Sequence, residues 1–222
     1  MFNPNPRQLA GIKAILFAAC LLPLLRLGWG AWNDELGANP IEFVTRSLGT
    51  WTLNFLLVTL TVTPLRKASG WLWLTRIRRM LGLFAFFYVV LHLSSYLWLD
   101  QFFDWTAIGK DILKRPFITV GMAAFMLLVP LAATSNNAMI RRLGGRRWQA
   151  LHRSIYVIGI FAVTHYWWLV KKDVALPGVY AATLGVLLAL RVLWRYQEKQ
   201  KLRAGAVQRN APGTVIPITS KR

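Results

Sequence analysis

The sequence predicts an all-α fold: a polytopic bundle of six transmembrane helices with both chain termini in the cytoplasm. Hydrophobic residues make up 55% of the 222 residues, above the roughly 45–50% of soluble domains. Six apolar runs approach or exceed the roughly 17–25 residues needed to span a bilayer. Basic and acidic residues also alternate from loop to loop, which is typical of a chain that crosses a membrane repeatedly.

The predicted membrane helices, in chain order, cover residues 10–30, 48–64, 80–99, 117–133, 150–169 and 176–194. The first run lacks a small-residue cleavage site and is followed by LLRLGWGAW, so we expect a retained helix and not a signal peptide. Its single Cys20 is interpreted as a small packing residue. We assign residues 1–200 to one membrane domain and residues 201–222 to a disordered cytoplasmic tail.

Lysine and arginine gather in the loops 65–79 and 134–147 and in the tail beyond Arg195, whereas seven of the eight acidic residues lie in the opposite loops. The positive-inside rule therefore places both termini and the two arginine-rich loops in the cytoplasm. The net charge of +19 would suggest nucleic-acid binding in a soluble protein, but topology explains it here. The sequence contains no glycine-rich nucleotide motif, so a nicotinamide donor would need a separate protein.

The three histidines, His92, His152 and His165, all fall within predicted membrane helices, where ionisable residues are functional hypotheses by default. Measured from the cytoplasmic helix starts, His92 lies about 18 Å and His165 about 24 Å along the axis, so the two share one outer level. Two neutral imidazoles at one depth can bind an iron porphyrin as its two axial ligands. We predict a b haem between them; a structural hydrogen bond for each histidine is the alternative.

His152 lies near the predicted cytoplasmic end, where a second haem or another cofactor could bind. No second histidine faces it, and Arg78 and Arg79 occupy the region where one would be useful. Arginine is a poor iron ligand because it stays protonated. On an ideal helix the side chains of His152 and His165 also point about 140° apart. To serve cofactors on one side of the helix they need a bulge or a tilt in it; otherwise they have different partners.

Several arginines, one acidic residue and two glycines are further candidate site residues. A planar guanidinium suits haem propionates or other anions. Alternatively, these arginines only supply the positive charge that sets the membrane orientation. The candidates are Arg78, Arg79, Arg147 and Arg153. Glu42 could handle quinone protons or pair with Arg46, and we favour the pairing. Gly144 and Gly145 predict a turn, with a phosphate-binding nest as the alternative.

Several segments together form a distinctive pattern: ANPIEF and GTWTLNFLLVTLTVTPLR, TRIRRMLGLFAFFYVVLHLSSY, RPFITVGMAAFMLLVPLAATS, and LGGRRWQALHRSIYVIGIFAVTHYWW. This pattern resembles the haem-binding membrane subunits of bacterial protein-methionine-sulfoxide reductase systems, within the ferric-reductase-like transmembrane family. The resemblance covers roughly residues 10–200.

The resemblance implies a multi-pass b-type cytochrome of the bacterial inner membrane. Such a subunit carries electrons from the quinone pool to a periplasmic molybdopterin methionine sulfoxide reductase, its heterodimer partner, which performs the sulfoxide chemistry and repairs oxidised envelope proteins. It also implies one or two b haems bound through His92, His152 and His165, and flavin mononucleotide (FMN). Relatives with two bis-histidine haems carry a second histidine in the third helix, where this chain has Arg78.

Two other functions fit the same sequence. One is a haem-containing ferric or oxygen reductase that receives electrons from a cytoplasmic flavin reductase docked on the arginine-rich loops. The other is a non-redox transporter or membrane scaffold whose histidines are structural. Haem absorption would distinguish a transporter or scaffold from the two haem proteins. The electron donor would distinguish the methionine-sulfoxide reductase subunit from the ferric or oxygen reductase.

Overall fold

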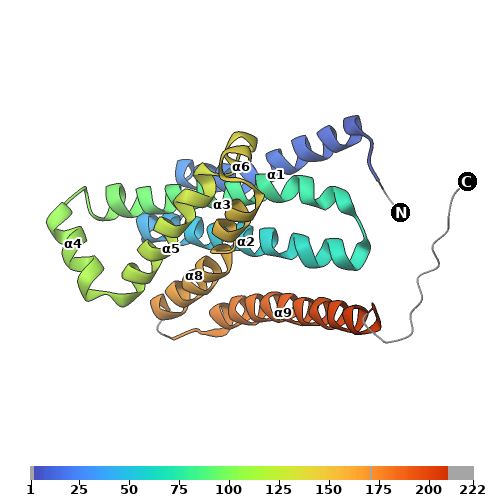
Figure 1. Cartoon of the computed structure of the whole chain (residues 1–222). Coiled ribbons are helices and arrows are strands. Elements are labelled where there is room, and N and C mark those ends of the chain that lie inside the picture. The colour runs from blue at the N-terminus through green and yellow to red at the C-terminus, as the bar shows by residue number, and fades with distance from the viewer. Residues whose placement is uncertain (1–2, 171, 210–222) are drawn as a thin grey trace, which may run out of the picture.

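The computed structural model describes residues 3–170 and 172–209, and all regular elements in these ranges are helical (Figure 1). The all-α prediction is therefore confirmed. A 3₁₀ turn (Leu72–Leu74) precedes the third α-helix and a π-helical turn (Tyr96–Asp100) follows it. The α-helices are α1 (Pro6–Trp32), α2 (Pro40–Ser69), α3 (Thr75–Ser95), α4 (Trp105–Lys114), α5 (Pro116–Ala133), α6 (Asn137–Leu143), α7 (Gly145–His152), α8 (Ile155–Leu169) and α9 (Ala175–Arg209).

Asparagine and proline set the beginnings of the first two helices. The Asn5 side chain accepts a hydrogen bond from the main-chain N–H of Gln8, and the Gln8 side chain accepts one from the main-chain N–H of Asn5. Pro6 then occupies the first turn, where its missing N–H removes no helical hydrogen bond. At α2 the Asn39 side chain accepts a hydrogen bond from the main-chain N–H of Glu42, and Pro40 occupies the first turn. Because these caps precede the apolar runs, both helices begin earlier than predicted from hydrophobicity.

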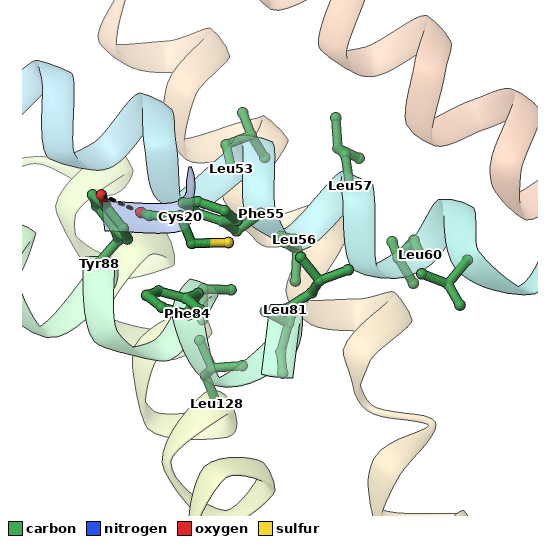
Figure 2. Close-up of a cluster of buried hydrophobic side chains, with 14 of the residues drawn as sticks. Cys20, Leu53, Phe55, Leu56, Leu57, Leu60, Leu81, Phe84, Tyr88 and Leu128 are labelled. Carbon is green, nitrogen blue, oxygen red and sulfur yellow. Dashed lines mark hydrogen bonds between the residues drawn. The ribbon is translucent and has the colours of Figure 1, made fainter. Parts of the chain in front are cut away.

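The core is densest where α2 and α3 pack against each other as a helical hairpin (Figures 1 and 2). Leu56 and Tyr88 are only 2% and 0% exposed. The Tyr88 hydroxyl donates a 2.8 Å hydrogen bond to the main-chain oxygen of Cys20, which ties α1 to this hairpin. The Cys20 side chain is buried in the same cluster, so its predicted packing role is confirmed.

Within the described residues, five helical segments are long and apolar enough to cross a membrane: Pro6–Trp32, Pro40–Ser69, Leu72–Asp100, Pro116–Ala133 and Ala175–Ala204. Large apolar side chains such as Ile15 and Val192 point outward, being 74% and 67% exposed. Such surfaces suit contact with lipid. Multiple membrane crossings are therefore supported, whereas the count of six is not confirmed.

The fifth predicted helix, residues 150–169, is interrupted. α7 ends at His152 and α8 begins at Ile155. The Arg153 N–H is shared between two carbonyls, and the Ser154 hydroxyl donates to the Leu151 carbonyl at 2.8 Å. A hydroxyl that bonds locally competes with the helical ladder, which favours a break. The 15 residues of α8 extend about 22 Å, less than the roughly 30 Å hydrocarbon core.

α5 and α8 form a second hairpin that crosses α2 and α3 obliquely, and α9 lies along α2 (Figure 1). The Arg191 guanidinium donates to the main-chain oxygen of Leu60 on α2, and the Tyr180 hydroxyl donates to the Asn54 side chain at 2.8 Å. α9 continues through Arg209, past the predicted domain end at residue 200. The rest of the predicted tail, residues 210–222, lies outside the described residues.

The connections 70–74 and 134–147 and the helix ends beside them form what we call the basic end of the bundle. Arg79 on α3 donates a 2.9 Å hydrogen bond to Asn137 on α6, and Lys67 on α2 pairs with Glu198 on α9 at 2.8 Å. Gly144 separates α6 from α7 with a φ of +75°, a conformation that favours glycine, so the predicted turn is confirmed. That this end faces the cytoplasm stays a prediction.

We expect Tyr88→Phe to lower the free energy of unfolding by about 1 kcal/mol, because the buried Cys20 carbonyl loses its hydroxyl donor. Thermal unfolding of the purified chain in detergent measures the change. The matched control is Tyr196→Phe, whose parent side chain is 63% exposed and should leave stability nearly unchanged. Equal stability of wild type and Tyr88→Phe would contradict a stabilising role for this bond.

Candidate functional site

His92 on α3 and His165 on α8 lie next to each other although 72 residues separate them, as expected from their predicted depths. Their ring centroids are 6.2 Å apart and their planes are inclined by 76°. Both residues are half-buried. The site therefore forms where the α2–α3 hairpin meets the α5–α8 hairpin.

Each imidazole is anchored through Nδ1 to a main-chain carbonyl of its hairpin partner. His92 Nδ1 lies 2.8 Å from the Thr45 oxygen on α2, and His165 Nδ1 lies 2.6 Å from the Phe117 oxygen on α5. A carbonyl oxygen can only accept, so Nδ1 must carry the proton in both rings. The neutral tautomer then leaves each Nε2 with a free lone pair, which is the form that binds a metal.

A glycine one helical turn after each accepting residue makes room for the ring. A Cβ atom on Gly49 would lie 3.0 Å from Cε1 of His92, and one on Gly121 would lie 2.7 Å from Nδ1 of His165. The glycines stand four residues after Thr45 and Phe117, so carbonyl and glycine are on the same helical face. Without a side chain there, each imidazole can approach the backbone of the neighbouring helix closely.

The two anchored histidines come from equivalent positions of two similar segments. The hydrogen-bonded residues are separated by 47 positions in the first hairpin and by 48 in the second. In both cases the accepting carbonyl belongs to the earlier helix and the histidine to the later one. The site is thus assembled from two similar units, each contributing one ligand-type nitrogen.

The 6.2 Å between the ring centroids equals the separation of two imidazoles that share one metal ion. A metal–nitrogen bond of about 2 Å on either side of an ion would place two imidazole centres about 6 Å apart. In the described part of the chain no group of three or more histidine, cysteine or carboxylate residues could hold a metal. A metal here would need its other ligands from elsewhere, and a porphyrin supplies four. The buried Thr45 hydroxyl, which has no hydrogen-bond partner among the described residues, is a polar group that a bound cofactor could satisfy.

His152 does not join the pair. Its Nε2 lies 3.0 Å from the Thr134 hydroxyl, and its ring stacks on Trp148 with centroids 4.0 Å apart. The Thr134 hydroxyl already donates to the Pro130 carbonyl at 2.6 Å, so His152 must be the donor in their contact. The nitrogen left free in His152 is therefore Nδ1, whereas in His92 and His165 it is Nε2. The break between α7 and α8 separates His152 from His165, so the ideal-helix angle does not apply.

The four predicted anion-binding arginines are exposed on the basic end: Arg78, Arg79, Arg147 and Arg153. Arg78 lies close enough to interact electrostatically with His152. Arg79 is held by Asn137, as described above. The Glu42–Arg46 ion pair, at 2.6 Å, confirms the structural interpretation of those two residues. The sequence interpretation missed the two accepting carbonyls and their glycines, although the Thr45-to-Gly49 and Phe117-to-Gly121 spacings were visible.

A family model described as "Ferric reductase like transmembrane component" matches residues 45–164, from the Thr45 anchor to the residue before His165. A curated relative from Azospira oryzae is 56% identical over 98% of this chain and 92% of its own length. Its name is "Protein-methionine-sulfoxide reductase heme-binding subunit MsrQ".

The chain belongs to the MsrQ family. Relatives with the same name from Herminiimonas arsenicoxydans and Ralstonia nicotianae are 55% and 53% identical, over 91% and 96% of this chain and 94% and 96% of theirs. No solved structure matches the chain. Membership of this MsrQ family, together with the five apolar helices, makes the chain a multi-pass membrane protein, and its bacterial relatives are consistent with the inner membrane.

We expect Gly121→Ala to lower the free energy of unfolding by about 1–3 kcal/mol, since the new methyl group overlaps a ring fixed by its hydrogen bond. Gly185→Ala on α9 is the matched control, because a Cβ atom there meets nothing within 4 Å. Chemical denaturation of both variants in detergent gives the comparison. If Gly121→Ala were as stable as the control, the close approach of His165 to α5 would be wrong.

Proposed function

We propose that this chain is the haem-binding membrane subunit of a protein-methionine-sulfoxide reductase system, and that His92 and His165 bind one b haem as its two axial ligands. The observation that supports this proposal best is the pair of imidazoles, 6.2 Å apart, with both Nδ1 atoms committed to carbonyls. The names of the relatives point to the same cofactor.

The chain would hold the group through the two Nε2 atoms and the apolar side chains around them. When bound, haem b supplies a one-electron couple between ferric and ferrous iron. The Nδ1–H bonds to Thr45 and Phe117 fix the ring orientation and make each imidazole a stronger donor. Gly49 and Gly121 keep these bonds short by letting the rings approach the helices. The residues of the chain thus set ligation and burial, while sulfoxide chemistry belongs to a partner.

The proposed electron path begins with a quinol and ends at a periplasmic molybdopterin reductase. A quinol releases two electrons and two protons, and reduction of methionine sulfoxide to methionine consumes two of each and forms water. Since haem b would supply a one-electron couple, the chain would act as a one-electron carrier between these two-electron reactions. The positive-inside rule supports this direction, because it puts the basic end in the cytoplasm and the other end towards the periplasm.

A second cofactor would bind at the basic end. His152 could offer Nδ1, and the nearby Arg78 could pair with an acidic group of that cofactor. Haem propionates and the phosphate of FMN are both suitable anions, with Arg79, Arg147 and Arg153 as further partners. This inner site would receive electrons from the donor and pass them towards the His92–His165 haem.

A separate flavin reductase is the second candidate donor, and one surface feature favours it. Arginines crowd the exposed helices on both sides of the Gly144 turn: Arg141, Arg142, Arg146 and Arg147. Such a positive surface can steer an acidic protein partner. In that case the chain would conduct electrons from the cytoplasmic flavoprotein without using the quinone pool.

We expect His92→Ala and His165→Ala each to abolish the low-spin bis-histidine spectrum, because one axial ligand is removed. Reduced-minus-oxidised spectra and pyridine haemochrome quantification of the purified variants measure this. Free imidazole should restore the low-spin bands in both variants if the cavity left by the side chain is the ligand site. His152→Ala should keep these bands, and their persistence in His92→Ala or His165→Ala would exclude the pairing.

Addition of a menaquinol analogue to the oxidised wild-type protein should produce the bands of ferrous b-type haem within the mixing time of the experiment. The control is NADH with a purified flavin reductase and no quinol. If the haem is reduced only by NADH with the flavin reductase, the electron donor is the flavoprotein and not quinol. A purified protein without any Soret band after expression with sufficient haem would refute the cytochrome function altogether.

A further inference from the structure

We propose that the groove between α1 and α3 at the basic end binds an anionic phospholipid, whose headgroup lies against Lys13, Arg76 and Arg79. This site includes none of the three histidines and does not depend on them, although it shares Arg79 with the proposed second cofactor site. The groove has a volume of about 540 Å³ and is shallow and largely open to its surroundings. Its chemistry changes along its length, from cationic at the basic end to apolar further into the bundle.

Aromatic residues together with Leu21, Met80 and Leu83 form the apolar part of the groove. Phe17 on α1 contacts Phe84 on α3 edge-on, with ring centroids 5.1 Å apart, and Phe84 in turn contacts Phe87 at 6.2 Å. One turn beyond Phe17, the Tyr88 hydroxyl holds the Cys20 carbonyl. These contacts fasten α1 to α3 on the side away from the basic end, and the groove continues from them towards the cations.

The cations at the groove have no carboxylate partner among the residues that the structure describes. The three ion pairs within the described residues involve Arg46, Lys67 and Arg115, and none involves the groove residues. In the described part of the chain, the one side-chain hydrogen bond from a groove cation is that of Arg79 to the neutral amide of Asn137. Three positive charges therefore converge on one side of an apolar groove without a compensating anion, and an anionic ligand would complement them.

The combination of charge and length selects the ligand class. From Lys13 to Leu21 the groove follows α1 for about 12 Å, which is enough for a glycerol backbone and the first part of an acyl chain. A quinone has an apolar tail but no anionic headgroup, and a free phosphate would leave the aromatic part unused. Basic pockets between membrane helices are typical sites for anionic lipid headgroups. A phospholipid such as phosphatidylglycerol meets both requirements.

Such a lipid would help to hold α1 in place. Only 11% of the apolar window of α1 is buried, against 44% for α2, so α1 shares little surface with the other helices. A lipid seated between Phe17 and Phe87, with its phosphate on Lys13 and Arg76, would add contacts to both helices at once. We therefore expect the bound lipid to stabilise the folded chain by linkage.

The test titrates the full-length protein in phosphatidylcholine-containing detergent micelles with phosphatidylglycerol and counts the bound lipid by native mass spectrometry. Wild type should bind one phosphatidylglycerol. Lys13→Gln combined with Arg76→Gln should weaken this binding about 30-fold, the loss expected for two basic residues at an anionic headgroup. Leu83→Trp should weaken it without any change of charge, because Leu83 lines the apolar part.

The matched control is Arg141→Gln combined with Arg142→Gln, which removes two exposed charges from the same end but outside the groove. Affinity within about twofold of wild type in this control supports a defined site, whereas an equal loss in both double variants means diffuse attraction and overturns the proposal. Competition by inorganic phosphate, or undiminished binding in Lys13→Gln with Arg76→Gln, also overturns it. Size-exclusion profiles verify folding, and Lys13→Gln alone, with an expected loss of about fivefold, replaces the double variant if that variant aggregates.

Discussion

The hydrogen bond from a histidine Nδ1 to a main-chain carbonyl of a neighbouring helix is the interaction on which the site depends. It decides the tautomer, and the tautomer decides which nitrogen can reach a metal. It also requires two helices to pack closely, because the acceptor belongs to the backbone and not to a flexible side chain. Glycine at positions 49 and 121 makes that approach possible. The tautomer of each histidine therefore depends directly on how closely its two helices pack.

The repeated hairpin explains why the remaining elements are arranged as they are. Each hairpin supplies a carbonyl, a glycine and a histidine at almost equal spacing, and the two hairpins must cross for the rings to meet. α9 supports the first hairpin through Arg191 and Tyr180, while α1 is attached through Tyr88. These outer helices contribute no ligand nitrogen. They bury the flank of α2 and α3 and present apolar surface outward.

Much of the fold could be predicted from hydrophobicity, because membrane helices must be apolar throughout, whereas the orientation that the charges indicate stays a prediction. The common depth of His92 and His165 followed from the constant helix rise. That their helices are neighbours is seen only in the structure. The exact helix ends did not follow: Pro6 and Pro40 extend the helices beyond the apolar runs. The carbonyl anchors were also out of reach, because a backbone acceptor is present at every residue. Only the three-dimensional crossing selects Thr45 and Phe117 from the other carbonyls.

The break after His152 shows why one unbroken helix is the wrong description of this region. Continuity would fix the angle between His152 and His165 and force them to different sides of a rigid rod. With Arg153 and Ser154 in a turn, α7 can place His152 against Thr134 while α8 independently places His165 against Phe117. The two histidines then protonate opposite nitrogens, because one donates to a hydroxyl through Nε2 and the other to a carbonyl through Nδ1. Whatever binds near His152 must therefore meet a different nitrogen, on a shorter and more exposed helix, beside arginines instead of a second imidazole.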